Sequence, residues 1–433
     1  MTPGPTYAEM GTPARTVRHI GELDPANLFL ITWRDHRGAI RCEVLPPELT
    51  GIRANILVLT GCHFPSGSHK VGAAYATLME GELAGEIRPG AHTVIGPSTG
   101  NFGIGTAYVA RLKGYRAVVI MPEQMSAERY RRIRQYGGEL DLTPGSESDV
   151  ILVLERAAEY AKDARNKVLA QFELLPNYRF HRYVTGQSAL EAAARHGNGR
   201  VAAFVAAPGS AGTLAAGDEI KSRFPDAVVC ALEPEECSTL FDGGSGRHRI
   251  EGIGDKMVTL IHNVLATDYV MTIHDDDCVA GLDLLECRQP LVERTLGMPE
   301  GSLARLRGLF GVSGVCNILG AIRTARFLGL EREHNVVTIA TDGFDRYPSV
   351  LADLAERAAV PGPEMVEAIF RGSSRVLDVH PREQKQRLFG LKREVWTRFG
   401  YTQSYLDGMQ SQGFWDAEYE RIPAINEALR RTR

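Results

Sequence analysis

The segment Pro97-Ser98-Thr99-Gly100-Asn101-Phe102-Gly103-Ile104-Gly105 stands between an apolar run, Thr93–Pro97, and a helical pattern over Gly103–Leu112. Backbone N–H groups at the start of a helix favour anions, and the hydroxyls of Ser98 and Thr99 add donors. The glycines do not form G-x-G-x-x-G, so the dinucleotide-binding fingerprint is absent. A loop capped by serine and threonine is the common alternative. By itself the segment predicts a strand–loop–helix corner that can bind a carboxylate or a phosphate.

The same order of strand, loop and helix recurs along the chain. The predicted strands are Asn55–Thr60, Thr93–Pro97, Ala117–Met121, Glu139–Leu142, Val168–Phe172, Val201–Ala206, Ala227–Leu232 and Asn335–Ala340. The predicted helices between them are Gly103–Leu112, Ser126–Arg134, Asp149–Ala161, Ala189–Arg195, Ala216–Arg223 and Val315–Phe327. Near-continuous apolar strands joined by crossover helices predict an α/β protein whose parallel sheets are covered on both faces.

The two ends of the chain have a different character. The Pro-rich beginning holds a possible hairpin of Leu28–Trp33 and Ala39–Val44. Beyond Pro361-Gly362-Pro363 an amphipathic helix is predicted from four apolar residues at helical spacing: Leu388, Leu391, Val395 and Phe399. This tail either packs on its own domain or serves as a subunit interface or lid.

Composition excludes several classes of protein. Apolar residues make up 44% of the 433 residues, which argues against disorder over most of the chain. A formal net charge of −4 gives no basic excess that would call for nucleic acid or an anionic membrane. No apolar run approaches the ~20 residues of a membrane span, and the N-terminus lacks a secretory apolar stretch. The seven cysteines form no C-x-x-C pair, so a reducing cytoplasm is expected and a zinc or other metal site is not.

Three other segments carry residue types that suit cofactor chemistry. In Phe64–Ala74, Lys70 begins an Ala-rich helix, where burial and the helix dipole would lower its pKa and let a neutral amine form a Schiff base. The alternative is a solvated lysine. Ala207–Thr213 also joins a strand to a helix, and its small residues would let backbone amides approach a phosphate. In Leu309–Asn317, Ser313 considered alone is a helix N-cap.

Together and in this order, the four segments resemble those of the cysteine synthase (O-acetylserine sulfhydrylase)/cystathionine β-synthase-like family of fold type II pyridoxal-phosphate enzymes. The resemblance covers about residues 55–352. Further matching segments are Thr106–Ala110, Gly114-Tyr115, Met121–Glu123, Met125-Ser126, Glu128-Arg129, Gly137-Gly138, Gln171-Phe172, Thr185-Gly186, His248–Gly254 and Arg346-Tyr347.

The resemblance implies two open parallel-sheet α/β subdomains of the tryptophan synthase β type, a helical C-terminal extension and a homodimer. The implied parts are an N-terminal extension with part of the large subdomain (1–71), a small mobile subdomain with the substrate carboxylate loop (72–178), a large cofactor-binding subdomain (179–380) and a helical tail (381–433).

The resemblance also implies pyridoxal 5'-phosphate as cofactor. Lys70 would hold it as a Schiff base and later take the α-proton. Asn101 would bind the phenolic oxygen, and Ser313 would face the pyridine nitrogen. The phosphate would be held by Gly209, Ser210, Ala211, Gly212 and Thr213. The substrate carboxylate would be bound by Ser98, Thr99, Gly100 and Phe102, with Gln171 assisting.

A serine facing the ring nitrogen leaves that nitrogen essentially neutral, which suits a β-substituent that leaves promptly. The leading prediction is therefore β-elimination or β-replacement on cysteine or an O-activated serine through an aminoacrylate, as in a cysteine synthase or a C–S lyase. The cofactor would carry the carbon chemistry.

Departures from the family pattern keep alternatives open. Phe102 stands where sulfhydrylases usually have threonine, and His69 beside Lys70 is similar to tryptophan synthase. Asp255 and Lys256 either form a solvated pair or grip a charged substrate group. The alternatives are a serine/threonine ammonia-lyase or racemase, tryptophan-synthase-like addition of another nucleophile, and a non-catalytic relative.

Overall fold

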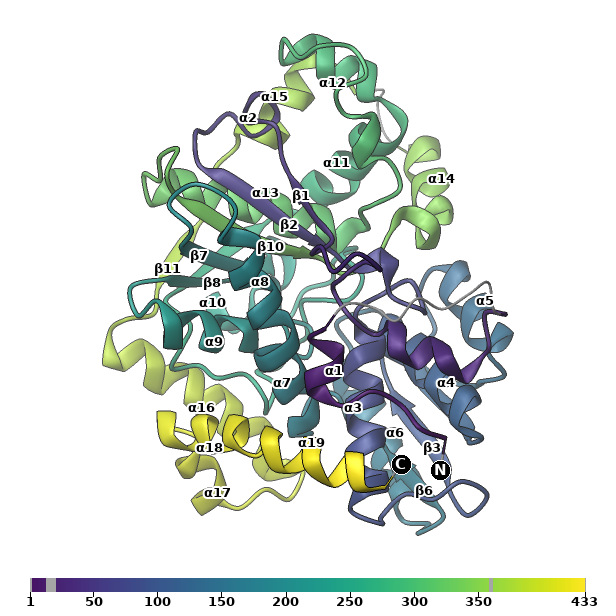
Figure 1. Ribbon diagram of the computed structural model, residues 1–433. Coiled ribbons are helices and arrows are strands. Elements are labelled where there is room, and N and C mark those ends of the chain that lie inside the picture. Colours follow the sequence, from purple (N-terminus) through teal and green to yellow (C-terminus); the bar gives the residue numbers. More distant parts are fainter. Residues whose placement is uncertain (1, 13–20, 358–360, 433) are drawn as a thin grey trace.

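The computed structural model describes residues 2–12, 21–357 and 361–432, which form two sheets with helices around them (Figure 1). The larger sheet has seven strands in the order β1-β2-β10-β7-β8-β9-β11. Their bounds are β1 Cys42–Val44, β2 Asn55–Thr60, β7 Val201–Ala206, β8 Val228–Pro234, β9 Tyr269–Ile273, β10 Asn335–Ala340 and β11 Val376–Asp378. The inner strands are parallel, and the edge strands β1 and β11 are antiparallel to their neighbours.

The smaller sheet has four parallel strands in the order β5-β4-β3-β6. Their bounds are β3 Thr93–Pro97, β4 Arg116–Pro122, β5 Glu139–Thr143 and β6 Asn166–Val168. The α/β class with two parallel-rich sheets and a helical C-terminal region is thereby confirmed. The subdomain boundaries inferred from the sequence stay a prediction.

Both sheets are buried on two faces because neighbouring residues of a strand point to opposite sides. In β4, Val119 packs into the core that includes α4 (Asn101–Lys113), whereas Val118 and Ile120 pack with Val153 of α6 (Val150–Ala161). In the larger sheet, α13 (Val312–Phe327) covers one face, and α8 (Gly186–Ala193) and α9 (Ala215–Arg223) cover the other (Figure 1). This two-sided burial explains the near-continuous apolar strands.

The remaining helices connect and flank the sheets. They are α1 Tyr7–Met10, α2 Pro47–Thr50, α3 Lys70–Leu83, α5 Ala127–Gln135, α7 Leu175–Phe180, α10 Thr239–Asp242, α11 Asp275–Cys287, α12 Gln289–Thr295, α14 Pro348–Arg357 and α15 Pro363–Arg371. Within the described residues, no helix combines the length and the apolar character needed to cross a bilayer.

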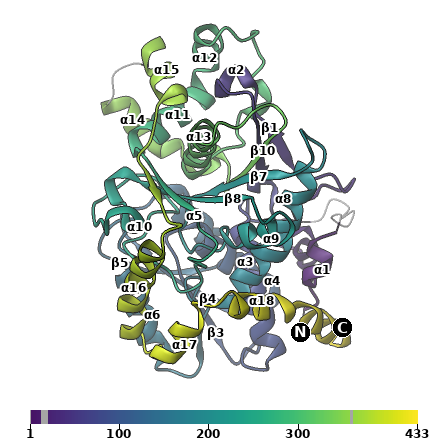
Figure 2. The same cartoon turned by 90° about the vertical axis from the view of Figure 1, so that its left-hand side faces the viewer.

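The tail consists of α16 (Arg382–Arg398), α17 (Gln403–Gly408), α18 (Gln412–Glu420) and α19 (Ile422–Arg431). It passes α7 and ends beside α1 and α3, so the first and last described helices lie together (Figures 1 and 2). The predicted amphipathic helix around Leu388 is confirmed as α16, with Leu388 fully buried.

Two local predictions are wrong in part or in whole. The predicted hairpin forms only at its turn, where Arg34 and Ile40 make an isolated antiparallel bridge. Its flanking strands do not form, because Pro25–Leu30 is a 3-10 helix whose cap Asp24 accepts from Ala26 N, and β1 pairs with β2. The strand expected over Val168–Phe172 ends at Val168, since the backbone carbonyl of Phe172 accepts hydrogen bonds from a distant segment rather than from a strand. Strands β9 and β11 had no corresponding prediction.

Candidate active site

The carboxyl ends of β2, β3, β7 and β10 converge on one pocket, as expected for ligand sites in parallel sheets. Twelve residues line it: Lys70, Ser98, Thr99, Asn101, Phe102, Gln171, Phe172, Gly209, Ser210, Gly252, Asp255 and Thr341. Nine of the predicted site residues are therefore brought together. The predicted residues outside the lining are Gly100, Ala211, Gly212, Thr213, Lys256 and Ser313.

Lys70 is the first residue of α3 and donates a hydrogen bond to Ser210 Oγ at 3.4 Å. Burial lowers the pKa of Lys70 to about 8, although the Asp255 and Glu147 carboxylates oppose the shift. A larger fraction of this amine is neutral at physiological pH than in an ordinary lysine, which nucleophilic attack on a carbonyl requires.

The carboxylate loop, residues 98–102, is held from within. Ser98 Oγ accepts from Gly100 N at 2.9 Å and from Gly103 N at 2.8 Å. Gly100 has a φ of 153°, and a Cβ there would lie 2.0 Å from the Arg129 guanidinium. Arg129 donates to Thr99 O at 3.0 Å, so the loop wraps closely around a buried cation.

Asn101 begins α4 and contacts a buried carboxylate, that of Asp342. Its Nδ2 donates to Asp342 Oδ2 at 2.6 Å, while its Oδ1 is buried without a hydrogen-bond partner. Asp342 follows β10, is fully buried, and also accepts from Tyr347 OH at 2.9 Å.

The phosphate turn, residues 209–213, is held by contacts from distant segments. Ala211 has a φ of 64°, the one positive φ among the described residues other than glycine. A Cβ on Gly209 would lie 2.4 Å from Gly252 O, and one on Gly212 would lie 2.3 Å from Asn177 Oδ1. Thr259 Oγ1 donates to the backbone carbonyl of Ser210 at 2.9 Å. Such a tight turn leaves backbone amides open to an anion.

Ser313 lies in the first turn of α13, but Gly311 is the N-cap, so the N-cap interpretation of Ser313 is wrong. Its Oγ is buried and has no hydrogen-bond partner. A buried hydroxyl without a hydrogen-bond partner is uncommon, so this one is available to a bound group that faces it.

Asp255 and Lys256 are separated by the structure. Asp255 is 5% exposed and its Oδ2 has no hydrogen-bond partner, so it is not half of a solvated pair. Burial raises the pKa of Asp255 to about 7, against the opposing charge of Lys70. Lys256 turns away and pairs with Asp149 at 2.8 Å.

Sequence reasoning missed the charged groups behind the loop. Arg129 is fully buried and its Nε lies 2.7 Å from Glu251 Oε2, which joins α5 to the segment before Gly252. Both residues fall in segments that match the family, but nothing in the sequence pairs them. Glu147 follows β5 and is 3% exposed. Burial raises its pKa well above the usual range although Arg129 opposes the rise, and no sequence signal marked it.

A segment without helix or strand, residues 255–267, is held by the tail. One face of α16 supplies the donors to its carbonyls: Trp396 Nε1 to Val258 O at 2.8 Å, Lys392 Nζ to Leu260 O at 3.0 Å and His262 O at 2.5 Å, and Lys385 Nζ to Val264 O and Leu265 O at 2.9 Å. This segment begins with Asp255 and carries Thr259, so the tail supports the phosphate turn from behind.

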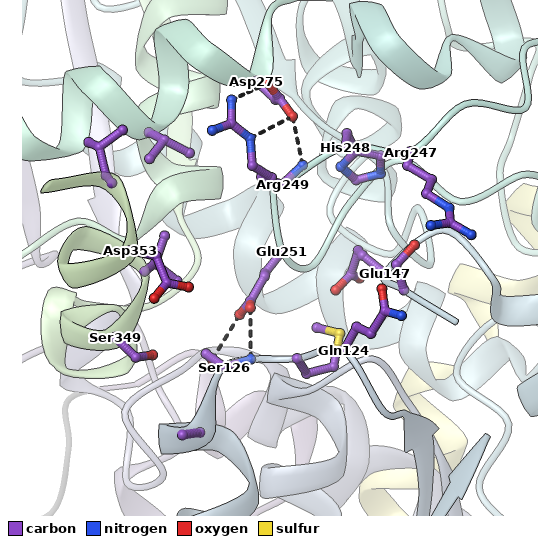
Figure 3. Close-up of a pocket in the computed structure, with 16 residues that line it drawn as sticks. Gln124, Ser126, Glu147, Arg247, His248, Arg249, Glu251, Asp275, Ser349 and Asp353 are labelled. Atoms are coloured by element: carbon purple, nitrogen blue, oxygen red, sulfur yellow. Dashed lines mark hydrogen bonds and ion pairs between the residues drawn. The ribbon is translucent and has the colours of Figure 1, made fainter. Parts of the chain in front are cut away.

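A second pocket of about 710 Å³ adjoins the first (Figure 3). Glu251 lines this second pocket, and the next residue, Gly252, lines the first. Across the described residues, no group of three or more His, Cys, Asp or Glu side chains is placed to hold a metal ion.

Comparison with known proteins gives consistent results. Residues 43–342 match the family described as pyridoxal-phosphate dependent enzyme. A cysteine synthase of Staphylococcus aureus is 32% identical over 297 residues, which are 68% of this chain and 88% of the relative. A probable cysteine synthase of Bacillus subtilis is 33% identical over 287 residues, 66% of this chain and 85% of the relative.

Among solved structures, an O-acetylserine dependent cystathionine beta-synthase from Helicobacter pylori superposes with a TM-score of 0.61 at 25% identity. The match covers 71% of this chain and 94% of that one. A hydrogen sulfide-producing enzyme from Fusobacterium nucleatum gives a TM-score of 0.60 at 25% identity, over 71% of this chain and 95% of the other.

Proposed function

This chain belongs to the pyridoxal-phosphate-dependent enzymes of the cysteine synthase family, and from this premise we propose that it catalyses β-elimination or β-replacement on cysteine or an O-activated serine. The position of Lys70 carries the proposal. Its amine lies in a pocket that is bounded by the carboxylate loop and by the phosphate turn. An amino acid whose carboxylate is held by that loop would present its α-carbon to this amine.

The donor set fits pyridoxal 5'-phosphate. Asn101, which lines the pocket, has a buried Oδ1 without a hydrogen-bond partner, and Ser313 Oγ is also buried without one. The crowded turn at Gly209 and Gly212 suits a phosphate bound by backbone amides. When bound, the cofactor would act as the electron sink that lets the α-proton and the β-substituent depart.

Each residue then has a separate task. Lys70 would hold the cofactor and move the α-proton, which a lowered pKa favours. Ser98, Thr99, Gly100 and Phe102, with Gln171, would hold the carboxylate. Asp255 would exchange a proton at the β-substituent, because its pKa of about 7 lets it act as an acid or a base near neutrality.

The first test is the visible absorption of the purified protein as amino acids are added singly: cysteine, O-acetylserine, O-phosphoserine, serine and threonine. A cofactor band that responds to one of them, followed by product release, is expected. Lys70→Ala should fold, as judged by circular dichroism, and lose turnover. Normal turnover by this variant, or no cofactor band after reconstitution, contradicts the proposal.

A serine or threonine ammonia-lyase is the second candidate, and one observation favours it. Hydroxide leaves poorly unless it is protonated, and Asp255 is a carboxyl near Lys70 whose pKa is raised by burial. Release of pyruvate or 2-oxobutyrate from unmodified serine or threonine would select this candidate.

Addition of an aromatic nucleophile stays a third candidate because buried Phe102 lines the pocket. A homodimer and a cytoplasmic location are further proposals, which light scattering and fractionation test.

A further inference from the structure

The pocket of about 710 Å³ is larger than sulfide or acetate requires. It lies between the smaller sheet, which supplies Gln124 to Ala127 and the loop after β5, and the larger unit, which supplies residues 247–251 with parts of α11 and α14. Its apolar side chains are Met125, Ala127, Val279, Val350 and Leu354. A volume in this range is typical of sites for whole small molecules.

Most of the buried acidic groups in this pocket already have partners. Glu251 pairs with Arg129 at 2.7 Å and accepts from Ser126 N and Oγ, and Asp275 pairs with Arg249 at 2.7 Å (Figure 3). Arg247 and Asp353 are both exposed, carry opposite charges and have no ion-pair partner among the residues described.

Glu147 is different. It is 3% exposed, and by distance and angle neither of its carboxylate oxygens accepts a hydrogen bond in the described parts of the chain, although the Thr99 hydroxyl lies close enough to lower its pKa. No other described carboxylate has both oxygens buried in this way. Buried acceptors are nearly always paired, so this carboxyl calls for donors from a ligand.

Glu147 also connects the pocket to the reaction site. It lines the larger pocket, and its charge acts on Lys70 and Asp255 in the smaller one. A group held at Glu147 therefore lies beside the place where the β-substituent leaves or arrives.

We propose that the larger pocket binds the variable group of the reaction, either the leaving group or the incoming nucleophile, and that this group is cationic, donates N–H hydrogen bonds to Glu147 and carries a short apolar chain. The inference rests on the proposed function for the identity of the group as a reactant. Binding in the pocket can be measured without it.

The test is calorimetric titration of the holoenzyme with propylguanidine and 1-propanol, two probes that share a propyl chain and do not react with a carbonyl cofactor at neutral pH. Propylguanidine should bind at least about tenfold more tightly than 1-propanol and should release a proton from Glu147. Glu147→Gln should abolish both the preference and the proton release. The matched control is Glu173→Gln, since Glu173 lies outside the pocket and accepts from Tyr401 OH at 2.8 Å. It should retain both.

Equal binding of propylguanidine and 1-propanol by the wild type, or an undiminished preference in Glu147→Gln, overturns the site. If Glu147→Gln does not fold, Val279→Trp should block the pocket and remove propylguanidine binding; retained binding is then the contradicting result.

The reactant role is tested by comparing 2-mercaptoethylguanidine with ethanethiol as incoming nucleophile. The ratio of their kcat/KM values should favour the guanidine and fall at least about tenfold in Glu147→Gln. A ratio near one contradicts the role even if propylguanidine binds. Absence of elimination from every amino acid contradicts the proposed function instead, and the titration still decides the site.

Discussion

The carboxylate loop and the phosphate turn are alike in sequence, since both are small-residue corners between a parallel strand and a helix, but they are stabilised differently. In the loop, the Ser98 hydroxyl binds amides two and five residues ahead. The turn is held by Asn177, Thr259 and Gly252, and behind them by α16. The loop is therefore held by its own hydroxyl and by two buried groups beside it, Arg129 and Asp342, whereas the turn depends on several distant segments and on the tail.

The largest effect is expected from a substitution that disrupts the carboxylate loop alone. In Gly100→Ala the new methyl group meets Arg129, and the residue must leave its φ of 153°. A cost of roughly 2–3 kcal/mol at this corner would weaken amino-acid binding about 100-fold. The cofactor band should persist while its response to the amino acid is lost. Parallel loss of cofactor and substrate binding would show that the two regions are not independent.

The next largest effect is expected from a substitution in the tail that weakens the support of the phosphate turn. Lys392→Met leaves the Leu260 and His262 carbonyls without their donor and should lower the free energy of unfolding by roughly 1–2 kcal/mol. Cofactor affinity should fall, because the weakened segment holds Thr259 against the turn. Urea unfolding and equilibrium dialysis measure the two quantities. An unchanged affinity for the cofactor would show that the tail does not support the phosphate turn.

A smaller effect is expected in the pH dependence of stability. Asp255 has a pKa near 7 in the folded protein, and near 4 when unfolded. The folded state binds the extra proton, so the stability from this group is complete below about pH 4 and is lost as the pH rises to about 7. Asp255→Asn should show a shallower decline over that window in urea unfolding of the cofactor-free protein. Identical slopes would contradict the burial of this carboxyl.

The smallest effect comes from Lys256→Met, which removes a partly exposed ion pair with Asp149. The free energy of unfolding should change by less than about 1 kcal/mol. This variant is the matched control for Lys392→Met, because each replaces a lysine on the same segment or its support. A drop as large as that of Lys392→Met would assign Lys256 a structural role comparable to that of the tail.

Local sequence patterns predicted the strands whose formation depends on local burial. Alternating apolar strands and helices identified β2, β3, β4, β5, β7 and β10 closely, since two-sided burial requires continuous apolar runs. The same patterns failed at Leu28–Trp33 and at Val168–Phe172. At the first, the backbone is decided locally, since Asp24 caps a 3-10 helix and β1 pairs with the nearby β2. At the second, the outcome depended on a partner far along the chain, since Phe172 O accepts from Leu260 N.

The sequence by itself determined the α/β class, the cofactor family and three segments that converge on the pocket, because each depends on residues that are neighbours along the chain. Only the tertiary structure decided which charges meet. It joined Ser126 to Glu251 across 125 residues, turned Lys256 away from Asp255, left Glu147 buried without a donor, and laid one face of α16 along residues 255–267. Such contacts depend on which surfaces remain uncovered after the sheets have packed, and no local pattern encodes that.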